Sequence, residues 1–215
     1  MGCKICAGPL CPILYYYFCP KCYFIAIAES KILPPEQERQ RYLQHINTVE
    51  ECGYVSMLEQ FIAKSIHPFH PHIQTALDFG SGPGPVLASL LKKRGYDVHV
   101  YDPYFAPEKI YFGHTYDLIT CTEVLEHLKN PFETLTLLKE LLNPGGILAI
   151  MTLFHPLQTP VAAQFFQWWY RRDATHISFF TPKTFHYIAK VLNLELMMID
   201  QKNTLSLKVK SPSLE

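Results

Sequence analysis

The chain has 215 residues, 48% of them hydrophobic and 13% aromatic, which suits one ordinary domain with a small appendage. Lysine plus arginine equals aspartate plus glutamate at 19 each, which excludes a broad electrostatic footprint for nucleic acid but not a local basic patch. No apolar run is long enough to cross a bilayer, and cysteines stand where a signal peptide would begin, so we expect a soluble cytoplasmic protein with no membrane partner.

Four of the seven cysteines form two pairs, Cys3-x2-Cys6 and Cys19-x2-Cys22, with twelve residues between them. Such pairs offer four soft thiolate ligands to one tetrahedral zinc ion. The alternative is four reduced cysteines in an unstructured tail, but so short a segment could hardly order itself without a metal. We therefore expect a zinc ribbon over residues 1–30, with Cys11 as a bystander.

Residues 31–72 read as a linker with covering helices. Pro34 and Pro35 mark the linker, a polar helix is expected from Glu36 to about Asn47, and an amphipathic helix from about Glu51 to Ser65. The three histidines between His67 and His72 alternate with prolines, so we interpret them as loop residues and not as metal ligands.

An apolar strand ends in the run Leu77–Gly84, which carries Asp78, Gly80, Ser81 and Gly82. Glycines at a strand-to-helix turn let a cofactor approach the backbone closely. A second strand, residues 96–101, ends in Asp102, whose carboxylate can accept two hydrogen bonds from a ribose diol. Together they predict a Rossmann-like nucleoside site.

The glycine spacing distinguishes between kinds of nucleoside cofactor. It departs from the dinucleotide fingerprint, and no lysine, serine or threonine of a phosphate loop follows. The run resembles motif I of the class I S-adenosylmethionine-dependent methyltransferases. Tyr116–His127 resembles that family's fourth strand and following loop, and Leu141–Thr152 its fifth strand with the preceding turn. The resemblance implies an α/β fold with a seven-stranded or reduced sheet over residues 73–210.

The resemblance also implies S-adenosylmethionine as cofactor. The residues expected to contact it are Asp78, Gly80, Ser81, Gly82, Asp102, Pro103, Cys121 and Thr122. Arg41–Asn47 resembles the stretch before the core in ubiquinone-pathway O-methyltransferases, so Arg41 or His45 can pair with the cofactor carboxylate. The alternative is that both are solvated residues on an exposed helix.

Methyl transfer needs an aligned nucleophile and, for many acceptors, a base. Glu123 and His127 follow the fourth strand at the carboxyl edge, where open α/β sheets bind ligands, and they share one face if a helical turn begins there. His176 lies in a later loop and titrates in a range that suits a general base. His127 can instead brace its loop, and the same holds for His155.

The aromatic run Phe165–Tyr170 can form a wall for an apolar substrate, although core packing is the commoner use of such a run. The stretch Trp168–Phe180 resembles the tail of a bacterial group of zinc-ribbon methyltransferases.

The segment between the second and fourth strands is short, because Asp117 follows Asp102 by only fifteen positions. We therefore expect a vestigial third strand near Lys109–Phe112, with adenine stacked on Pro103, Tyr104 or Phe105.

The sequence of the C-terminal part predicts a helix that begins at Thr181 and Pro182 and runs to about Val191, followed by two strands that form a hairpin.

Three functions stay open. The first is a small-molecule methyltransferase. The second is an RNA methyltransferase with a zinc-ribbon reader, as the resemblance to some ribosomal-RNA guanine methyltransferases suggests. The third is a non-catalytic cofactor-binding scaffold. An RNA enzyme predicts a basic strip joining the ribbon, Lys92–Arg94 and Arg171–Arg172; the ribbon's sparse charge favours a lid.

Overall fold

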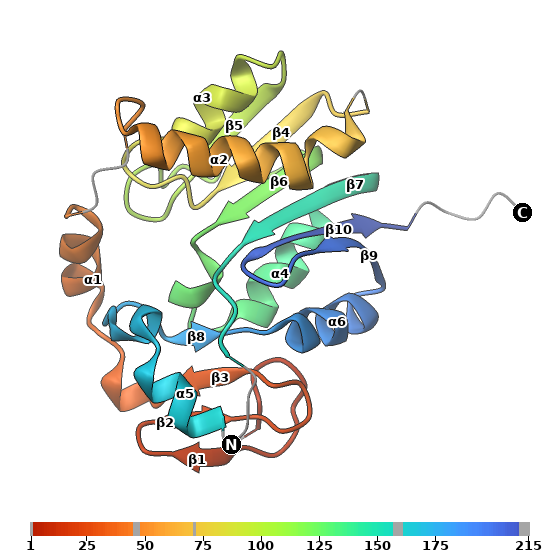
Figure 1. Ribbon diagram of the computed structural model, residues 1–215. Coiled ribbons are helices and arrows are strands. Elements are labelled where there is room, and N and C mark those ends of the chain that lie inside the picture. The colour runs from red at the N-terminus through yellow and green to blue at the C-terminus, as the bar shows by residue number, and fades with distance from the viewer. Residues whose placement is uncertain (1, 45–47, 71, 157–160, 211–215) are drawn as a thin grey trace, which may run out of the picture.

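Two sheets organise the computed structural model, which describes residues 2–44, 48–70, 72–156 and 161–210 (Figure 1). The larger sheet has six strands in the order β5-β4-β6-β7-β10-β9, and the smaller has four in the order β1-β2-β3-β8. The strands of the larger sheet are β4 (Thr75–Phe79), β5 (Asp97–Tyr101), β6 (Tyr116–Thr122), β7 (Leu142–Met151), β9 (Leu194–Ile199) and β10 (Thr204–Val209).

Strands β5, β4, β6 and β7 run parallel, whereas β10 is antiparallel to both β7 and β9. The second half of β7, Ile147–Met151, is a continuous buried apolar run because both faces of the sheet are covered there. Along β7, Ile147 and Ala149 belong to one apolar cluster and Leu148 and Ile150 to the other, which shows a core on each face. The carboxyl ends of these strands meet at one edge, from which the loops after β4, β5 and β6 begin.

Helices cover both faces of the larger sheet (Figure 1). On one face, α2 (Cys52–Ser65) and α3 (Val86–Lys92) bury apolar residues such as Leu58 and Leu91 against Leu118. On the other face lie α4 (Pro131–Glu140) and α6 (Pro182–Val191), with Leu135 and Phe185 in the second cluster. The Rossmann-like architecture expected from the sequence is confirmed.

The reduced form of the sheet is also observed, but the expected vestigial third strand is wrong. Residues Lys109–Phe112 form turns, and the segment after β5 closes on itself through an isolated bridge between Asp102 and Ala106. Tyr111 is buried beside Tyr101, with ring centroids 5.0 Å apart. The chain there covers the sheet edge with an aromatic side chain and adds no strand.

The remaining predicted elements agree closely with the structure. The polar helix is α1 (Pro35–Tyr42), which ends before the expected Asn47. Helix α6 begins with a capping box between Thr181 and Thr184, and β9 and β10 form the expected hairpin. The other elements are α5 (Val161–Gln167), η1 (Glu29–Lys31), η2 (His67–Phe69), η3 (Leu125–His127) and η4 (Trp169–Arg172).

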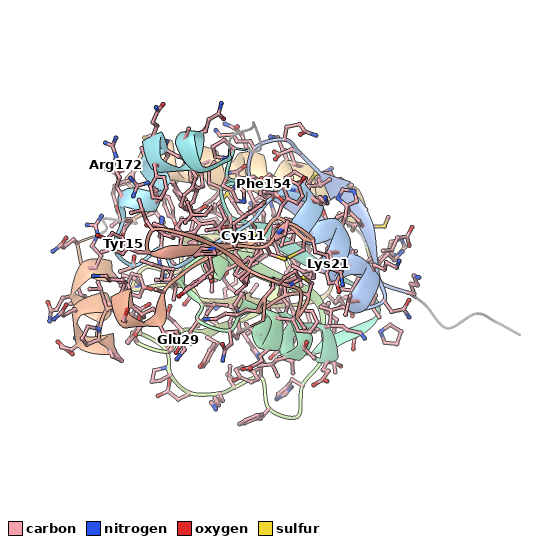
Figure 2. All side chains as sticks on the ribbon, turned by 90° about the horizontal axis from the view of Figure 1, so that it is seen from below. Cys11, Tyr15, Lys21, Glu29, Phe154 and Arg172 are labelled. Carbon is pink, nitrogen blue, oxygen red and sulfur yellow. The ribbon has the colours of Figure 1, made fainter. Side chains whose placement is uncertain are left out.

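The ribbon sheet contains β1 (Cys11–Ile13), β2 (Tyr16–Phe18) and β3 (Ile25–Ile27), and a fourth strand, β8 (Ser178–Phe179), comes from the far half of the chain. Ile25 pairs with Phe179 and Ala26 with Ser178. Figure 2 views the molecule from the ribbon side. The ribbon therefore does not stand apart as a separate body, because its sheet is completed by the segment that follows His176.

Two polar contacts join the ribbon to the core as well. His155 Nε2 lies 2.7 Å from the Tyr23 carbonyl oxygen, and the Thr184 hydroxyl donates to the Cys22 carbonyl at 2.9 Å. His155 is buried, and burial lowers the pKa of its imidazole. His155 thus braces the ribbon, which matches the bracing alternative given for it.

Candidate functional site

The glycine-rich turn after β4 has two glycines that need their small size for different reasons. Both have left-handed backbones, with φ of 81° at Gly80 and 66° at Gly82. A Cβ on Gly80 would lie 2.3 Å from Val124 Cγ2, whereas a Cβ on Gly82 would have no atom of the described residues within 4 Å. Gly80 therefore lets the loop after β6 pack on the turn, and Gly82 leaves open space beside the backbone.

Asp102 at the end of β5 organises the neighbouring loops. Its Oδ2 accepts from Gly82 N at 2.9 Å, and its Oδ1 accepts from Tyr104 N at 2.8 Å and Phe105 N at 3.0 Å. A carboxylate oxygen has two acceptor positions. Oδ1 therefore uses both, and Oδ2 keeps one for a ribose hydroxyl. Ribose binding by Asp102 stays a prediction, with one acceptor position in place of the expected two.

The other residues predicted to contact the cofactor differ in their exposure to solvent. Asp78 is buried, accepts from the Thr120 hydroxyl at 2.8 Å, and has its pKa raised to about 6 by burial. Burial also raises the pKa of the Cys121 thiol. Ser81 and Thr122 are half-buried and Pro103 is exposed. His45 lies outside the described residues. None of these roles toward a cofactor is tested by the fold.

Two carboxylates share one tyrosine at the carboxyl edge. The Tyr170 hydroxyl lies 2.9 Å from Glu123 Oε2 and also contacts Glu126 Oε1, while Thr152 donates to Glu126 Oε2 at 2.9 Å. One hydroxyl proton can serve only one carboxylate at a time. Burial and the neighbouring Glu126 raise the pKa of Glu123. Part of the Glu123 side chain is exposed, so Glu123 connects the fully buried Glu126 to solvent.

Two imidazoles complete this group, which we term the edge cluster: Glu123, Glu126, His127, Tyr170 and His176. His127 Nδ1 lies 3.0 Å from the Thr175 carbonyl oxygen, and His176 Nδ1 lies 2.7 Å from the Tyr170 carbonyl oxygen. Their ring centroids are 4.8 Å apart. Burial and the neighbouring His127 lower the pKa of His176. Near neutral pH, His176 is therefore a neutral imidazole that can accept a proton.

An ion pair fastens α1 to the loop that carries His176. Asp173 Oδ1 accepts from the Thr175 backbone at 3.0 Å and from its hydroxyl at 2.7 Å, and Oδ2 pairs with Arg41 Nη2 at 2.7 Å. Burial opposes the shift, but these hydrogen bonds hold the pKa of Asp173 below its usual range. Because Asp173 engages Arg41, the expected pairing of Arg41 with a cofactor carboxylate stays a prediction.

Helix α1 covers the site through a second set of contacts. Glu38 accepts from the Tyr42 hydroxyl at 2.5 Å and from the Tyr104 hydroxyl at 2.8 Å. The Tyr42 ring meets the His127 ring edge to face, with centroids 5.1 Å apart. The helix thus bridges the loop after β5 and the loop after β6.

Sequence reasoning missed Glu126 and Thr152, and it gave no role of its own to Asp173, which lies in the loop of His176. Glu126 sits in the same Glu-x-x-Glu-His run as Glu123 and His127, and its spacing could have pointed to it. The expected helical turn shared by Glu123 and His127 is wrong: Glu123 has φ of 53°, and η3 begins two residues later, at Leu125. Tyr170 was expected only as part of the aromatic run Phe165–Tyr170, which can form a wall for an apolar substrate.

The four paired cysteines come together in the ribbon. Cys3 Sγ lies 3.5 Å from Cys22 Sγ, Cys6 Sγ lies 3.3 Å from Cys19 Sγ, and all four sulfurs lie within 4.8 Å of one another. Zinc–sulfur bonds of about 2.3 Å in a tetrahedron place sulfurs roughly 3.8 Å apart. Cys11 is exposed and outside this group.

The two cysteine pairs have the same backbone conformation. Cys3 N donates to Gly8 O and Cys19 N to Phe24 O, both at 2.9 Å. Ala7 and Tyr23, which follow the second cysteine of each pair, have φ of 53° and 64°. Backbone N–H groups also point at Cys3 and Cys6 sulfurs at 3.4 Å. This donor set fits one zinc ion.

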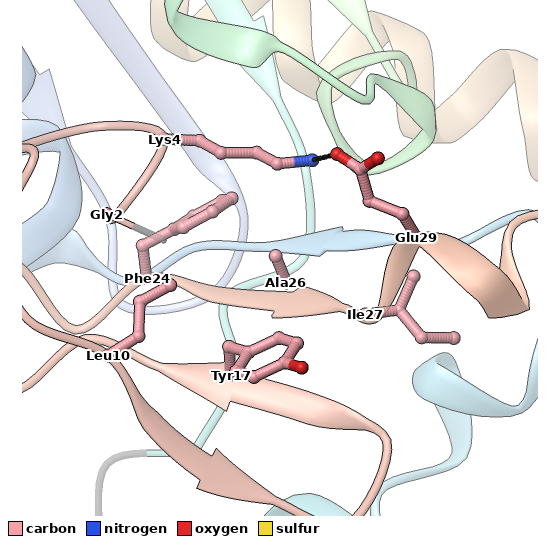
Figure 3. Close-up of a pocket in the computed structure, with 8 residues that line it drawn as sticks. All are labelled: Gly2, Lys4, Leu10, Tyr17, Phe24, Ala26, Ile27 and Glu29. Atoms are coloured by element: carbon pink, nitrogen blue, oxygen red, sulfur yellow. Dashed lines mark ion pairs between the residues drawn. The ribbon is translucent and has the colours of Figure 1, made fainter.

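Two pockets lie away from the carboxyl edge. The pocket in Figure 3, beside the Lys4–Glu29 ion pair of the ribbon, has a volume of about 20 Å³, room for roughly one water molecule. A second, of about 290 Å³, is lined by Asp117, Gly145 and Lys208 near the opposite edge of the larger sheet. Neither pocket is lined by a residue of the glycine turn or of the edge cluster, so the candidate site is placed there because of its open turn and its titratable side chains.

Comparison with solved structures defines the class of fold. Magnesium protoporphyrin IX methyltransferase from Synechocystis PCC 6803 is 14% identical with a TM-score of 0.55, and the match covers 81% of this chain and 94% of that one. An O-methyltransferase family protein from Burkholderia thailandensis is 14% identical with a TM-score of 0.54, over 74% of this chain and 56% of that one. Mitomycin 7-O-methyltransferase is 14% identical with a TM-score of 0.54, over 72% and 53%. These are structures of the class I S-adenosylmethionine-dependent methyltransferase fold.

A family model described as a methyltransferase domain matches residues 37–198, most of the chain. The chain belongs to this methyltransferase family. It spans little more than half the length of several of the structures it matches. No protein with a curated description matches the sequence. Among the described residues, no helix is both long and apolar enough to span a membrane.

Proposed function

We propose that the protein transfers a methyl group from S-adenosylmethionine to an oxygen atom of a small molecule. One observation carries this proposal: the open turn at Gly82 and the edge cluster lie on adjoining loops, held together where Val124 packs on Gly80. The space that we assign to the cofactor and a group of proton acceptors are therefore at one edge of the sheet, which is where open α/β sheets bind ligands.

The cofactor, when bound, supplies a methyl group activated on a sulfonium. The chain's own residues hold it: Gly82 leaves room beside the backbone, Ser81 and Thr122 line the half-buried surface, and Asp102 offers its remaining acceptor position. His176 and Glu123 are assigned to the acceptor's proton. His176, whose pKa is lowered, can take that proton on its neutral imidazole near pH 7, and Glu123 can take it when its carboxyl group is ionised.

The charge distribution favours a small molecule over RNA. In Figure 1 the ribbon and α3, which precedes Lys93 and Arg94, lie at opposite ends of the molecule. In Figure 2 Lys21 and Arg172 lie on opposite sides of the ribbon face. Arg171 is engaged with the Phe166 carbonyl at 2.6 Å. The basic strip that an RNA enzyme would need is therefore interrupted.

We assign one structural zinc ion to Cys3, Cys6, Cys19 and Cys22. The resemblance of residues 168–180 to a bacterial group of zinc-ribbon methyltransferases supports this assignment. So does the pairing of β8, within that stretch, with the ribbon strand β3. The resemblance of the Arg41–Asn47 segment to ubiquinone-pathway O-methyltransferases supports an oxygen acceptor. The ribbon then serves to position the loop that carries His176.

Cofactor binding is tested with two glycine substitutions of matched strain. Gly82→Ala and Gly95→Ala both place a Cβ on a left-handed backbone with open space around it, and Gly95 lies after α3, away from the site. We expect calorimetry to show at least tenfold weaker S-adenosylmethionine binding for Gly82→Ala and near-native binding for Gly95→Ala. Equal affinities would remove the cofactor pocket from this turn.

Methyl transfer is tested by incubating the protein and labelled cofactor with two pools, hydroxylated small molecules and RNA. We expect label in the small-molecule pool only. Label in RNA would establish the RNA enzyme instead. Cofactor binding without transfer to either pool would favour the non-catalytic scaffold.

A further inference from the structure

The edge cluster contains two carboxyl groups whose negative charge is not balanced by lysine or arginine side chains of the described residues. Glu126 is fully buried, and among the described residues its two carboxylate oxygens accept only hydroxyl hydrogen bonds, from Tyr170 and Thr152. Glu123 shares the same Tyr170 hydroxyl. Among the ion pairs of the described residues, none joins a lysine or arginine to either glutamate. Burying a carboxylate without a positive partner is costly, so the arrangement favours a cation at this point.

The two histidines have the tautomers that metal ligands need. Nδ1 of His127 and Nδ1 of His176 each face a backbone carbonyl oxygen, which can only accept, so each Nδ1 carries the proton. In the neutral form of each ring, the lone pair then lies on Nε2. Metal-binding histidines commonly donate their other N–H to a carbonyl or carboxylate in this way, which fixes the ring orientation.

The Glu126 carboxylate and the two imidazoles lie close together in the fold. Glu126, His127 and His176 each offer a ligand atom, and the three atoms lie within 4.8 Å of one another. Ligands on neighbouring positions of one octahedral ion with bonds of about 2.1 Å are roughly 3 Å apart, a separation that small side-chain rotations would reach. Both histidines are half-buried and Glu123 is exposed, so an ion and further ligands can enter from solvent.

We propose that Glu126, His127 and His176 form a binding site for a divalent first-row transition-metal ion, separate from the zinc of the ribbon. Two imidazoles and a carboxylate suit Mn²⁺, Fe²⁺ or Zn²⁺, and they leave coordination positions open. Four thiolates, in contrast, form a closed structural site. The role of this ion rests on the proposed function: it would bind the acceptor's hydroxyl oxygen and favour loss of its proton. That proton would pass to Glu123, because the Nε2 lone pair of His176 is then used to bind the ion.

The test uses Mn²⁺ as the probe, because thiolates select softer ions and the ribbon keeps its zinc. The full chain, with one zinc per chain confirmed by elemental analysis, is titrated with Mn²⁺ in the absence of cofactor. The free ion is followed by electron paramagnetic resonance. We expect one Mn²⁺ to bind per chain, and at least tenfold weaker binding in both Glu126→Gln and His176→Gln.

His186→Gln is the matched control, since His186 is exposed on α6 with its Nδ1 facing the Pro182 carbonyl at 2.7 Å. It should bind Mn²⁺ as the native chain does. Circular dichroism shows whether Glu126→Gln folds, and His176→Gln, at a half-buried position, gives a second measurement. Native binding no tighter than that of a folded His176→Gln variant would overturn the proposal. Calorimetry of S-adenosylmethionine with the same variants tests the proposed function separately, since a chain can bind Mn²⁺ and fail to bind cofactor.

Discussion

The ribbon's cysteines and the acids at the carboxyl edge both collect groups that become anions, and both bury them. The ribbon gathers four cysteines from two local turns of identical conformation, with sulfurs already at near-tetrahedral separations. The carboxyl edge gathers Asp78 from the end of β4, Glu126 and His127 from the segment after β6, and His176 from a distant loop. A closed site, such as the one with four cysteines, can thus be formed by short local turns. An open site, such as the one at the carboxyl edge, needs side chains from distant parts of the fold.

The strongest test of this comparison removes a ribbon ligand. Cys19→Ser should lose the zinc and destabilise the chain by several kcal/mol, because structural zinc supplies folding free energy and Cys19 lies in the large apolar cluster. Thermal unfolding together with elemental analysis measures both effects. Cys11→Ser, at an exposed cysteine of β1, should leave the melting temperature and the metal content unchanged. Full stability of Cys19→Ser without metal would contradict a structural zinc.

The next largest effect concerns the buried Asp78. Its pKa of about 6 in the folded chain exceeds the ordinary value of about 3.9. The folded chain therefore binds this proton more tightly than the unfolded chain. The free energy of unfolding should then fall by about 3 kcal/mol in total as pH rises from 4 through about 6. Asp78→Asn should remove most of that fall in denaturant titrations.

Asp97→Asn is the control for Asp78, since Asp97 is an exposed aspartate at the start of the neighbouring strand β5. Its pH profile should match that of the native chain. If Asp78→Asn retains the native profile too, burial of the Asp78 carboxyl is not the cause of the pH dependence.

Tyr170→Phe addresses the edge cluster directly. It removes the hydroxyl that Glu123 and Glu126 share and should cost about 1–3 kcal/mol, the usual penalty for depriving a buried acceptor of its donor. Urea unfolding measures the change. Tyr15→Phe, at an exposed tyrosine of the ribbon, should be neutral. A neutral Tyr170→Phe would mean that the two carboxylates are satisfied without this hydroxyl.

The smallest effect on stability is expected for the ion pair between Arg41 and Asp173. Arg41→Gln should cost about 1 kcal/mol or less, because the arginine side chain is 41% exposed. Its effect on turnover should be larger, since Asp173 also holds the loop of His176. Lys64→Gln, which breaks the other ion pair to a loop aspartate, Asp200, serves as the control and should leave turnover unchanged. Equal turnover in both variants would show that the ion pair does not position the loop.

The sequence revealed features that depend on neighbouring residues. Three such features are the Cys-x2-Cys spacing, the glycine turn and the start of the helix at Thr181–Pro182. Each depends on residues only a few positions apart, and the fold contains the elements expected there. The features that escaped depend on contacts between distant segments. Nothing near Asp102 shows that its carboxylate holds three backbone amides, and nothing near Tyr170 shows that two glutamates meet there.

The same distinction explains the error at Lys109–Phe112. A short strand and a turn that covers a sheet edge with Tyr111 share similar residues, and only packing against Tyr101 separates them. Likewise, Glu123 and His127 suggested a helical face by their spacing. The left-handed backbone at Glu123, next to the residue that packs on Gly80, prevented the turn from starting there.

The pairing of β8 with β3 has a consequence for the order of folding. Ile25 cannot meet Phe179 until almost the whole chain has left the ribosome, so the N-terminal sheet keeps an open edge throughout most of synthesis. Contacts of such long sequence separation form late and slowly. Early zinc binding would then protect the ribbon strands from pairing with other nascent chains. When β8, the last strand of the ribbon sheet to be synthesised, pairs with β3, it would also bring the neighbouring His176 into place.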